Sequence, residues 1–498
     1  MTIDQSSADP RRSPALRAGV ASRAGTVSCA GTVSCAGATV GTRGSAAPGT
    51  RVRPSSVKPL AALDTGTPCA MRRRSMLLGG AGLAIAGALA ACGPSGGGGA
   101  AAGAAPTTGP APGSAASGAT AVSAVTTAAA APEYHEASAS STALSAGSWS
   151  GAIGDKTMTL SGAHIVDGIE ATIDGGTFES TSADEAVFLV VGGGSLTITN
   201  ARINKSGDAS TDGRHGVDDS YNFYGLNSAV VVVGEGSTAT VRQTTLTTSS
   251  SGSNAVVAIG SATATVTGCA ISTTGESSRG LHATYAGVIN GSDLTIETRG
   301  AHCAAVATDR GSGTVAVDGA NTFTTSGDGS PCIYSTGEIT VSGLTGTANG
   351  AQAVVVEGKN RATVTDSTLV TASQTGGVML YQSMSGDAAD SDAAKEVSTL
   401  VMTGVSLTCT QAVPILYVTN TSSQATLTQC TLQTPGGLAT ADEDRWGKTG
   451  SNGGELALTL DATSSDGAIA AGSTSSITVT TANGGAATGA VSGSVTVS

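Results

Sequence analysis

The sequence predicts an all-β protein, a parallel β-helix of about a dozen coils, and three observations carry this prediction. First, Gly accounts for 71 of the 498 residues and aromatic residues for only 3%, a balance that favours short strands and many turns. Second, one unit of about 24 residues recurs from residue 150 onward, and a fixed period of this length is typical of solenoids. Third, the amphipathic runs that helical repeats of similar length need are missing.

Each repeat contains a small apolar run, a Gly-rich or polar turn, a strand in which Thr alternates with apolar residues, a second turn and a short third strand. Clear copies begin at Ala229, Ala255 and Ala353. Three short strands per period predict coils that stack about 4.8 Å apart and align their inward side chains in ladders. We expect the middles of the Thr-alternating strands to form one such ladder: Ile198, Val241, Val266, Ile296, Val317, Val341, Val364, Met402 and Leu427.

Residues 71–91 read as an export signal. Three arginines, Arg72 to Arg74, precede an apolar run of about 15 residues, which is too short to span a bilayer comfortably. The run ends in Leu89-Ala90-Ala91-Cys92, which resembles the lipobox of bacterial lipoproteins. This resemblance implies cleavage before Cys92 and attachment of diacylglycerol, with palmitate-type acyl chains, to its thiol. Arg73-Arg74 also resembles a twin-arginine signal, so the export route stays open between that pathway and the general one.

The rest of the N-terminal region divides into two parts. Residues 1–70 contain a tandem duplication ending in Cys29 and Cys35, and we expect them to be an untranslated leader, with Met71 as the true start. Residues 92–149 are rich in Gly, Ala, Ser, Thr and Pro, which predicts a disordered tether. The β-helix is then expected over residues 150–498. Together these features predict an extracytoplasmic lipoprotein that is anchored to the membrane and exposed at the cell surface.

The charge of the exported part is strongly negative. From Cys92 onward the sequence has 13 basic and 33 acidic residues, a formal charge of −20. Such a surface repels nucleic acid, so we expect no nucleic-acid partner.

Five cysteines fall in the expected β-helix. Cys269 and Cys430 occupy equivalent positions of distant repeats, as small ladder residues would. Cys303 with Cys332, and Cys409 with Cys430, lie in neighbouring coils, so either free buried thiols or disulfides are compatible with their spacing. The spacing matches no zinc motif, and we expect no metal and no cofactor.

At these repeats the chain resembles a group of bacterial surface proteins within the right-handed, pectate-lyase-like β-helix class. The resemblance covers about residues 180–460 and implies the fold and a cell-surface setting; it implies no established activity. Its motifs are Tyr224–Ala229, Asp309–Gly311, Ile333–Thr336, Glu357–Asn360, Tyr381–Asp387 and Trp446–Gly454.

One outer column of the β-helix is our candidate site. Aligning the repeats at Ile333-Tyr334-Ser335 predicts that Ala307, Tyr334, Val356, Tyr381 and Tyr417 stack, beside carboxylate, amide and basic groups. Aromatic faces next to polar side chains suit sugar rings; the alternative is that these tyrosines only fill a turn. The candidate glycan-binding residues are Tyr334, Tyr381, Tyr417, Asp309, Arg310, Glu357, Lys359 and Gln382.

Chemistry beyond binding has weaker support in the sequence. Acidic groups at Asp208–Asp219 and Asp387–Asp392 read as solvated loops, because their spacing matches no calcium motif. The histidines are scattered, and the loop around Trp446 reads as a cover near the C-terminal coils. We therefore expect a non-catalytic, adhesin-like protein that binds a polysaccharide or a host or neighbouring cell surface. The alternatives are a polysaccharide lyase or glycoside hydrolase that uses Asp309, Glu357 and Lys359, and a structural spacer.

Overall fold

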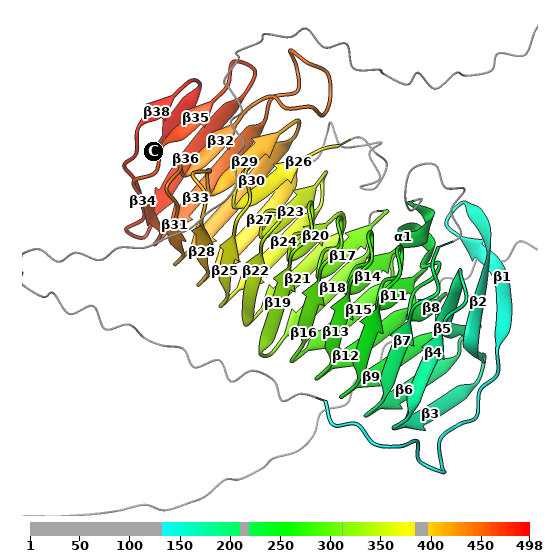
Figure 1. Ribbon diagram of the computed structural model, residues 1–498. Helices are drawn as coiled ribbons and strands as arrows, with labels where there is room; N and C mark the ends of the chain where they lie inside the picture. The colour runs from blue at the N-terminus through cyan, green and yellow to red at the C-terminus, as the bar shows by residue number, and fades with distance from the viewer. Residues whose placement is uncertain (1–131, 210–218, 311, 384–396) are drawn as a thin grey trace, which may run out of the picture. The chain divides into compact units, whose positions relative to one another are not determined.

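The computed structural model describes residues 132–209, 219–310, 312–383 and 397–498, and in them the chain forms a parallel β-solenoid of about 12 turns (Figure 1). The one helix of these residues is α1 (Ser220–Tyr224). The predicted all-β class and parallel β-helix are therefore confirmed. The leader, the export signal, Cys92 and the tether up to residue 131 lie outside the described residues.

Three long sheets form the walls of the solenoid. Sheet A contains 14 strands in the order β1 (Gly147–Ile153), β2 (Lys156–Asp167), β5 (Glu185–Val191), β8 (Val230–Val233), β11 (Val256–Ile259), β14 (Leu281–Thr284), β17 (Val306–Asp309), β20 (Ile333–Ser335), β23 (Val354–Glu357), β26 (Val378–Tyr381), β29 (Leu416–Thr419), β32 (Ala439–Ala441), β35 (Ile469–Ala471) and β38 (Val491–Ser492).

Sheet B contains 13 strands: β3 (Glu170–Asp174), β6 (Ser195–Thr199), β9 (Thr238–Arg242), β12 (Thr263–Thr267), β15 (Val288–Ser292), β18 (Thr314–Asp318), β21 (Glu338–Ser342), β24 (Arg361–Thr365), β27 (Ser398–Thr403), β30 (Ser422–Thr428), β33 (Glu455–Asp461), β36 (Ser476–Ala482) and β39 (Val495–Val497).

Sheet C contains ten strands: β4 (Thr177–Ser180), β7 (Arg202–Lys205), β10 (Thr245–Thr248), β13 (Ala270–Thr273), β16 (Thr295–Thr298), β19 (Asn321–Thr325), β22 (Leu344–Ala348), β25 (Thr368–Thr371), β28 (Ser406–Cys409) and β31 (Thr431–Gln433). Near the C-terminus β34 (Ser464–Ser465) pairs with β37 (Ala486–Ala487).

The inward ladder of sheet B matches the predicted anchors in eight of nine coils. Val241 pairs with Val266, and the register continues to Leu427. The prediction was wrong at Ile296, which lies in β16 of sheet C, because the inward position of that coil is Gly291 in β15. A Cβ on Gly291 would come within 2.9 Å of Leu294, so a neighbouring leucine fills the space that a valine occupies elsewhere. Glycine at this position hid the strand from the Thr-alternation pattern.

The first coil is closed by residues that precede the expected start at residue 150. The amide of Ser138 donates to the carbonyl of Asp174 (2.8 Å), and that of Thr142 donates to Thr172 (2.7 Å). β1 and β2 then form an antiparallel hairpin. These contacts cover the edge strand β3, which would otherwise offer unpaired backbone groups to another chain.

All five described cysteines are buried free thiols. Burial raises the pKa of Cys269 and of Cys332 to about 12. Cys269 and Cys430 both sit in the short turn between sheets B and C, as their equivalent repeat positions predicted. Thiols that stay protonated in this way are poor nucleophiles.

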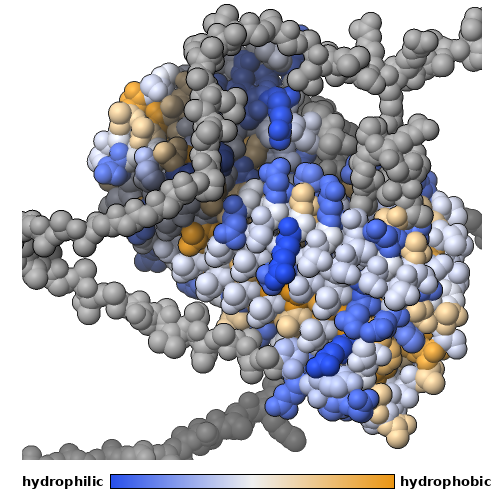
Figure 2. Space-filling view, viewed as in Figure 1, coloured by the Kyte–Doolittle hydropathy of each residue, from blue (hydrophilic) through white to orange (hydrophobic). Residues whose placement is uncertain are grey.

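The outer faces of the sheets differ. Figure 2 shows a face of mostly intermediate hydropathy with isolated hydrophilic side chains, and the exposed large apolar residues among those described are Ile169, Val491 and Val497. Strands of sheet B alternate between buried and partly exposed residues, whereas four-residue strands of sheet A such as β14, β17, β23 and β26 are buried on both faces. The outer faces of these four strands are therefore covered, whereas β20 and β29 each keep a partly exposed tyrosine.

Candidate functional site

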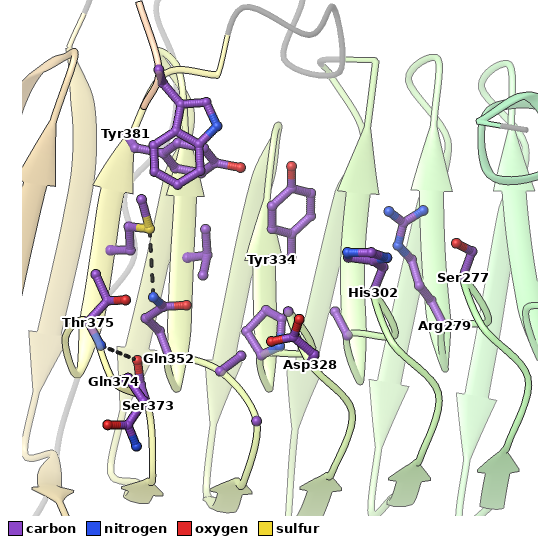
Figure 3. Close-up of a pocket in the computed structure, with 18 of the residues that line it drawn as sticks. Ser277, Arg279, His302, Asp328, Tyr334, Gln352, Ser373, Gln374, Thr375 and Tyr381 are labelled. Atoms are coloured by element: carbon purple, nitrogen blue, oxygen red, sulfur yellow. Dashed lines mark hydrogen bonds between the residues drawn. The ribbon is translucent and has the colours of Figure 1, made fainter. Parts of the chain in front are cut away.

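A groove of about 800 Å³ runs along the outer side of sheet A. The groove crosses successive coils rather than following one of them. Its lining residues fall within five segments, one in each of five coils: 276–279, 302–304, 328–334, 350–355 and 373–381. Asp219 and Asn222 line it near α1, and Asp444, Arg445 and Trp446 line it from the loop that follows β32. Figure 3 shows Arg279, His302, Tyr334 and Gln352 projecting from neighbouring coils in this order.

Aromatic and apolar side chains form one part of the groove, which we call the aromatic cluster. Val355, Met379 and Tyr381 are its buried members, and Tyr334, Tyr417 and Trp446 pack against them. The Tyr381 and Trp446 rings lie 4.7 Å apart between centroids at 57°. Tyr334, Tyr417 and Trp446 are partly exposed, and partly exposed rings offer the flat apolar faces that sugar rings need.

The predicted tyrosine column was partly wrong in register. In the structure the column that contains Tyr334 continues through Val355 and Met379 to Tyr417. Tyr381 instead pairs with Glu357, two residues further along the strand. The valines of Val354–Val356 allowed more than one alignment of this repeat, and the sequence pattern could not decide between them. The three tyrosines still meet in the aromatic cluster.

Glu357 lies beneath the aromatic cluster and is fully buried. Its carboxylate accepts hydrogen bonds from the Tyr334 hydroxyl, from the Tyr381 hydroxyl (2.8 Å) and from the hydroxyl and backbone amide of Ser383. Burial raises the pKa of Glu357, and these donors only partly offset it. Because one carboxyl binds hydroxyls from strands on both sides, Glu357 fixes the two rings relative to each other.

A second buried group lies nearer α1. Arg279 Nη1 is 2.6 Å from Asp309 Oδ2, and His282 Nε2 is 3.2 Å from the same oxygen. Burial opposes ionisation of Asp309, but Arg279 and His282 outweigh it and lower the pKa of Asp309. Burial, reinforced by the charge of Arg279, lowers the pKa of His282. Arg279 lines the groove while His282 and Asp309 lie beneath it, so the two buried residues hold the arginine in place.

The structure separates the remaining predicted site residues from the groove lining. The Tyr417 hydroxyl donates to Asp444 Oδ2 (2.9 Å) and so supports the loop that carries Trp446. Arg310 reaches the other way, with Nε 3.2 Å from the Tyr285 hydroxyl. Lys359 is half-buried in the turn after β23. Gln382 is buried, and its backbone carbonyl accepts a hydrogen bond from Asn420 Nδ2 (2.6 Å). Of the eight candidates, Tyr334 and Tyr381 line the groove.

Sequence reasoning missed Asn222, Arg279 and His302, and it treated Trp446 only as part of a cover. Asn222 lies in an insertion that has no counterpart in other repeats, and Arg279 occurs in a turn that varies in sequence. The signal that could have found Trp446 is its rarity, because the chain has only two tryptophans.

The described residues contain no group of three or more His, Cys, Asp or Glu side chains placed to hold a metal ion. Most of the two acidic segments, including Asp212, Asp218, Asp387, Asp390 and Asp392, lies outside the described residues. Among the residues with described positions, no helix combines the length and apolar character that a membrane crossing requires. Comparison with protein-family models, curated proteins and solved structures gave no significant match.

Proposed function

We propose that this protein binds a glycan in the groove along sheet A and does not cleave it. The observation that carries the proposal is the aromatic cluster, because Tyr334, Tyr381 and Trp446 line one concave surface together with polar side chains such as Gln352 and Gln374. Apolar ring faces stack on sugars, and amides and hydroxyls bond to their hydroxyl groups.

The burial of Glu357 and Asp309, the carboxyl groups that the sequence offered for an enzyme, favours binding over catalysis by these two residues. A glycoside hydrolase needs carboxyl groups that flank the scissile bond, and a general acid must reach the proton acceptor. Glu357 is enclosed by Tyr334, Tyr381 and Ser383, and Asp309 is enclosed by Arg279 and His282. Both carboxyl groups thus hold groove residues in position, which is the work of a binding site.

We further propose that the protein works at the cell surface, as a lipoprotein related to the pectate-lyase-like β-helix class. The lipobox ending at Cys92 and the Gly/Ala/Thr-rich residues after it support an anchored, extended placement of the solenoid. A polysaccharide of the same or a neighbouring cell is the partner that suits this setting.

The test of glycan binding is Trp446→Ala, measured by calorimetry against a broad panel of neutral and charged oligosaccharides. Truncating this large aromatic contact should weaken binding by about tenfold or more, which is about 1.4 kcal/mol. Thr265→Ala, on the outer face of sheet B, is the control and should bind like wild type. If the wild-type protein binds no glycan, the structural spacer becomes the favoured hypothesis. Release of new reducing or unsaturated sugar ends would favour an enzyme.

The test of anchoring is Cys92→Ser expressed in a bacterial host. We expect the wild-type protein in the membrane fraction and the variant in the soluble exported fraction, since serine cannot receive the thioether-linked lipid. An unchanged distribution between the two fractions would contradict lipidation at Cys92.

A further inference from the structure

The end of the groove nearest α1 differs from the aromatic cluster in having buried polar groups. Asn222 and Arg279 both line it, and the two residues are 5% and 9% exposed. Buried polar atoms at the wall of a groove are costly unless something pairs with them, so they indicate what a ligand must offer there.

Arg279 supplies donors at a fixed place. Its Nη1 is held 2.6 Å from Asp309 Oδ2, which engages one of the three guanidinium nitrogens in the ion pair. A guanidinium has five N–H donors and no acceptor. The guanidinium carbon lies 6.0 Å from the centroid of the Tyr334 ring, so these donors stand beside an aromatic face. Figure 3 shows Arg279 extended on the same side of the sheet as Tyr334.

Asn222 supplies an acceptor. Its Oδ1 atom is buried and receives no hydrogen bond from any residue whose position is described. Asn222 belongs to α1, which packs over β14, the strand that follows Arg279. α1 and the turn before β14, which pack together, thus bring a donor and a residue with an unpaired acceptor to this end of the groove.

The charge of the groove selects against anionic ligands. Four carboxylates line it, at Asp219, Glu276, Asp328 and Asp444. Of the two arginines that line it, Arg279 is paired with the buried Asp309, whereas Arg445, 4.3 Å from the centroid of the Trp446 ring, keeps its charge and offsets one of the four carboxylates. A sugar carboxylate or sulfate would face this negative field, and its oxygens would also meet the Asn222 acceptor.

We infer that this end of the groove is a specificity subsite for the acetamido group of an N-acetylated sugar. The acetamido carbonyl accepts from Arg279, its N–H donates to Asn222 Oδ1, and its methyl packs against the Tyr334 ring. A carboxylate lacks the donor, and an ammonium group lacks the acceptor that Arg279 requires. The inference rests on the proposed glycan binding and adds the substrate class.

The experiment compares linear oligosaccharides derived from cellulose, chitosan and chitin, which carry a hydroxyl, an amino and an acetamido group at the same ring carbon. Calorimetry with the wild-type protein should show the acetamido oligomer binding about tenfold tighter than the hydroxyl oligomer. Asn222→Ala should bring the two within about threefold of each other by weakening only the acetamido oligomer. Asn290→Ala, an exposed asparagine on the outer face of sheet B, is the matched control and should keep the preference.

Two results would overturn the subsite and leave glycan binding intact. One is equal or tighter binding of the hydroxyl oligomer, which is uncharged like the acetamido oligomer, by the wild-type protein. The other is an Asn222→Ala variant that binds other glycans normally and keeps the full acetamido preference. Failure of the wild-type protein to bind any member of the broad glycan panel would instead remove the proposed function, and the subsite with it.

Discussion

The outer faces of sheets A and B have the same backbone arrangement but differ in their side chains and in the loops beside them. From β2 onward in sheet A and throughout sheet B, both are parallel ladders with one strand per coil. Residues 268–269 are enough to turn from β12 into β13, whereas residues 274–280 lead from β13 into β14. The longer loops at sheet A wall the groove, and the outer side chains there include Tyr334 and Met379 where sheet B has Thr340 and Thr363. A repetitive scaffold thus acquires a site where its loops lengthen and its outward residues enlarge.

The largest effect should come from breaking the buried ion pair on the sheet A side. Asp309 and Asp318 are the last residues of β17 and β18 in one coil, but Asp309 is buried and Asp318 is exposed. Asp309→Ala leaves Arg279 without its counter-charge and should lower the free energy of unfolding by about 3–5 kcal/mol. Asp318→Ala should change it by less than about 0.5 kcal/mol. Urea unfolding measures both, and equal losses would contradict the contrast between the faces.

A smaller effect is expected at Glu357. Glu357→Ala deprives the Tyr334 and Tyr381 hydroxyls of their acceptor and should cost about 1–3 kcal/mol of unfolding free energy. Glu357→Gln keeps an acceptor for them and should cost less.

The same glutamate should give a pH dependence of known sign. The fold raises the pKa of Glu357, so the protonated side chain stabilises the folded state. This contribution to the free energy of unfolding is fully present below the ordinary carboxyl pKa of about 4.3 and is lost as pH rises through the folded pKa. The stability of Glu357→Gln relative to wild type should therefore rise across that window. Urea unfolding at a series of pH values tests this, and a difference that does not change with pH would show that the carboxyl titrates normally.

The smallest effect should come from exchanging side chains between the faces. Val355→Thr buries a hydroxyl in the covered face of sheet A and should cost about 1 kcal/mol. Thr340→Val, in the exposed ladder of sheet B, should stay within about 0.5 kcal/mol of wild type. Thermal unfolding of the two variants ranks them, and a more harmful Thr340→Val would mean that the sheet B face is covered in solution.

The fold could be predicted from the sequence because each coil repeats the same steric requirements. Small apolar residues face inward, Thr faces outward, and residues such as Gly268 occupy turn positions with positive φ, which glycine adopts readily. The prediction failed at Gly291, where Leu294 fills the ladder from outside the strand. The pattern of residues within one strand cannot show that a side chain from the following turn fills an inward position.

The site was predictable only in part. Tyr334 and Tyr381 stood out as rare aromatics in repeat positions, but their register depended on which residue of a valine run faced outward. The burial of Glu357 and Asp309 could not be predicted, since turn carboxylates on the surface have the same sequence appearance. Asn222 and Trp446 reach the groove from insertions, and nothing in the repeat indicates where an insertion folds back.

The direction of the groove has a consequence for how its specificity can change. The groove crosses the coils from Arg279 to Met379, so its length is a whole number of coil steps, about 19 Å for the four steps between β14 and β26. Duplication or loss of one coil would lengthen or shorten it by about 4.8 Å without rebuilding either end wall. Under the proposed glycan binding, the number of coils between the α1 end and the Trp446 end would therefore set the length of oligosaccharide that the groove accommodates.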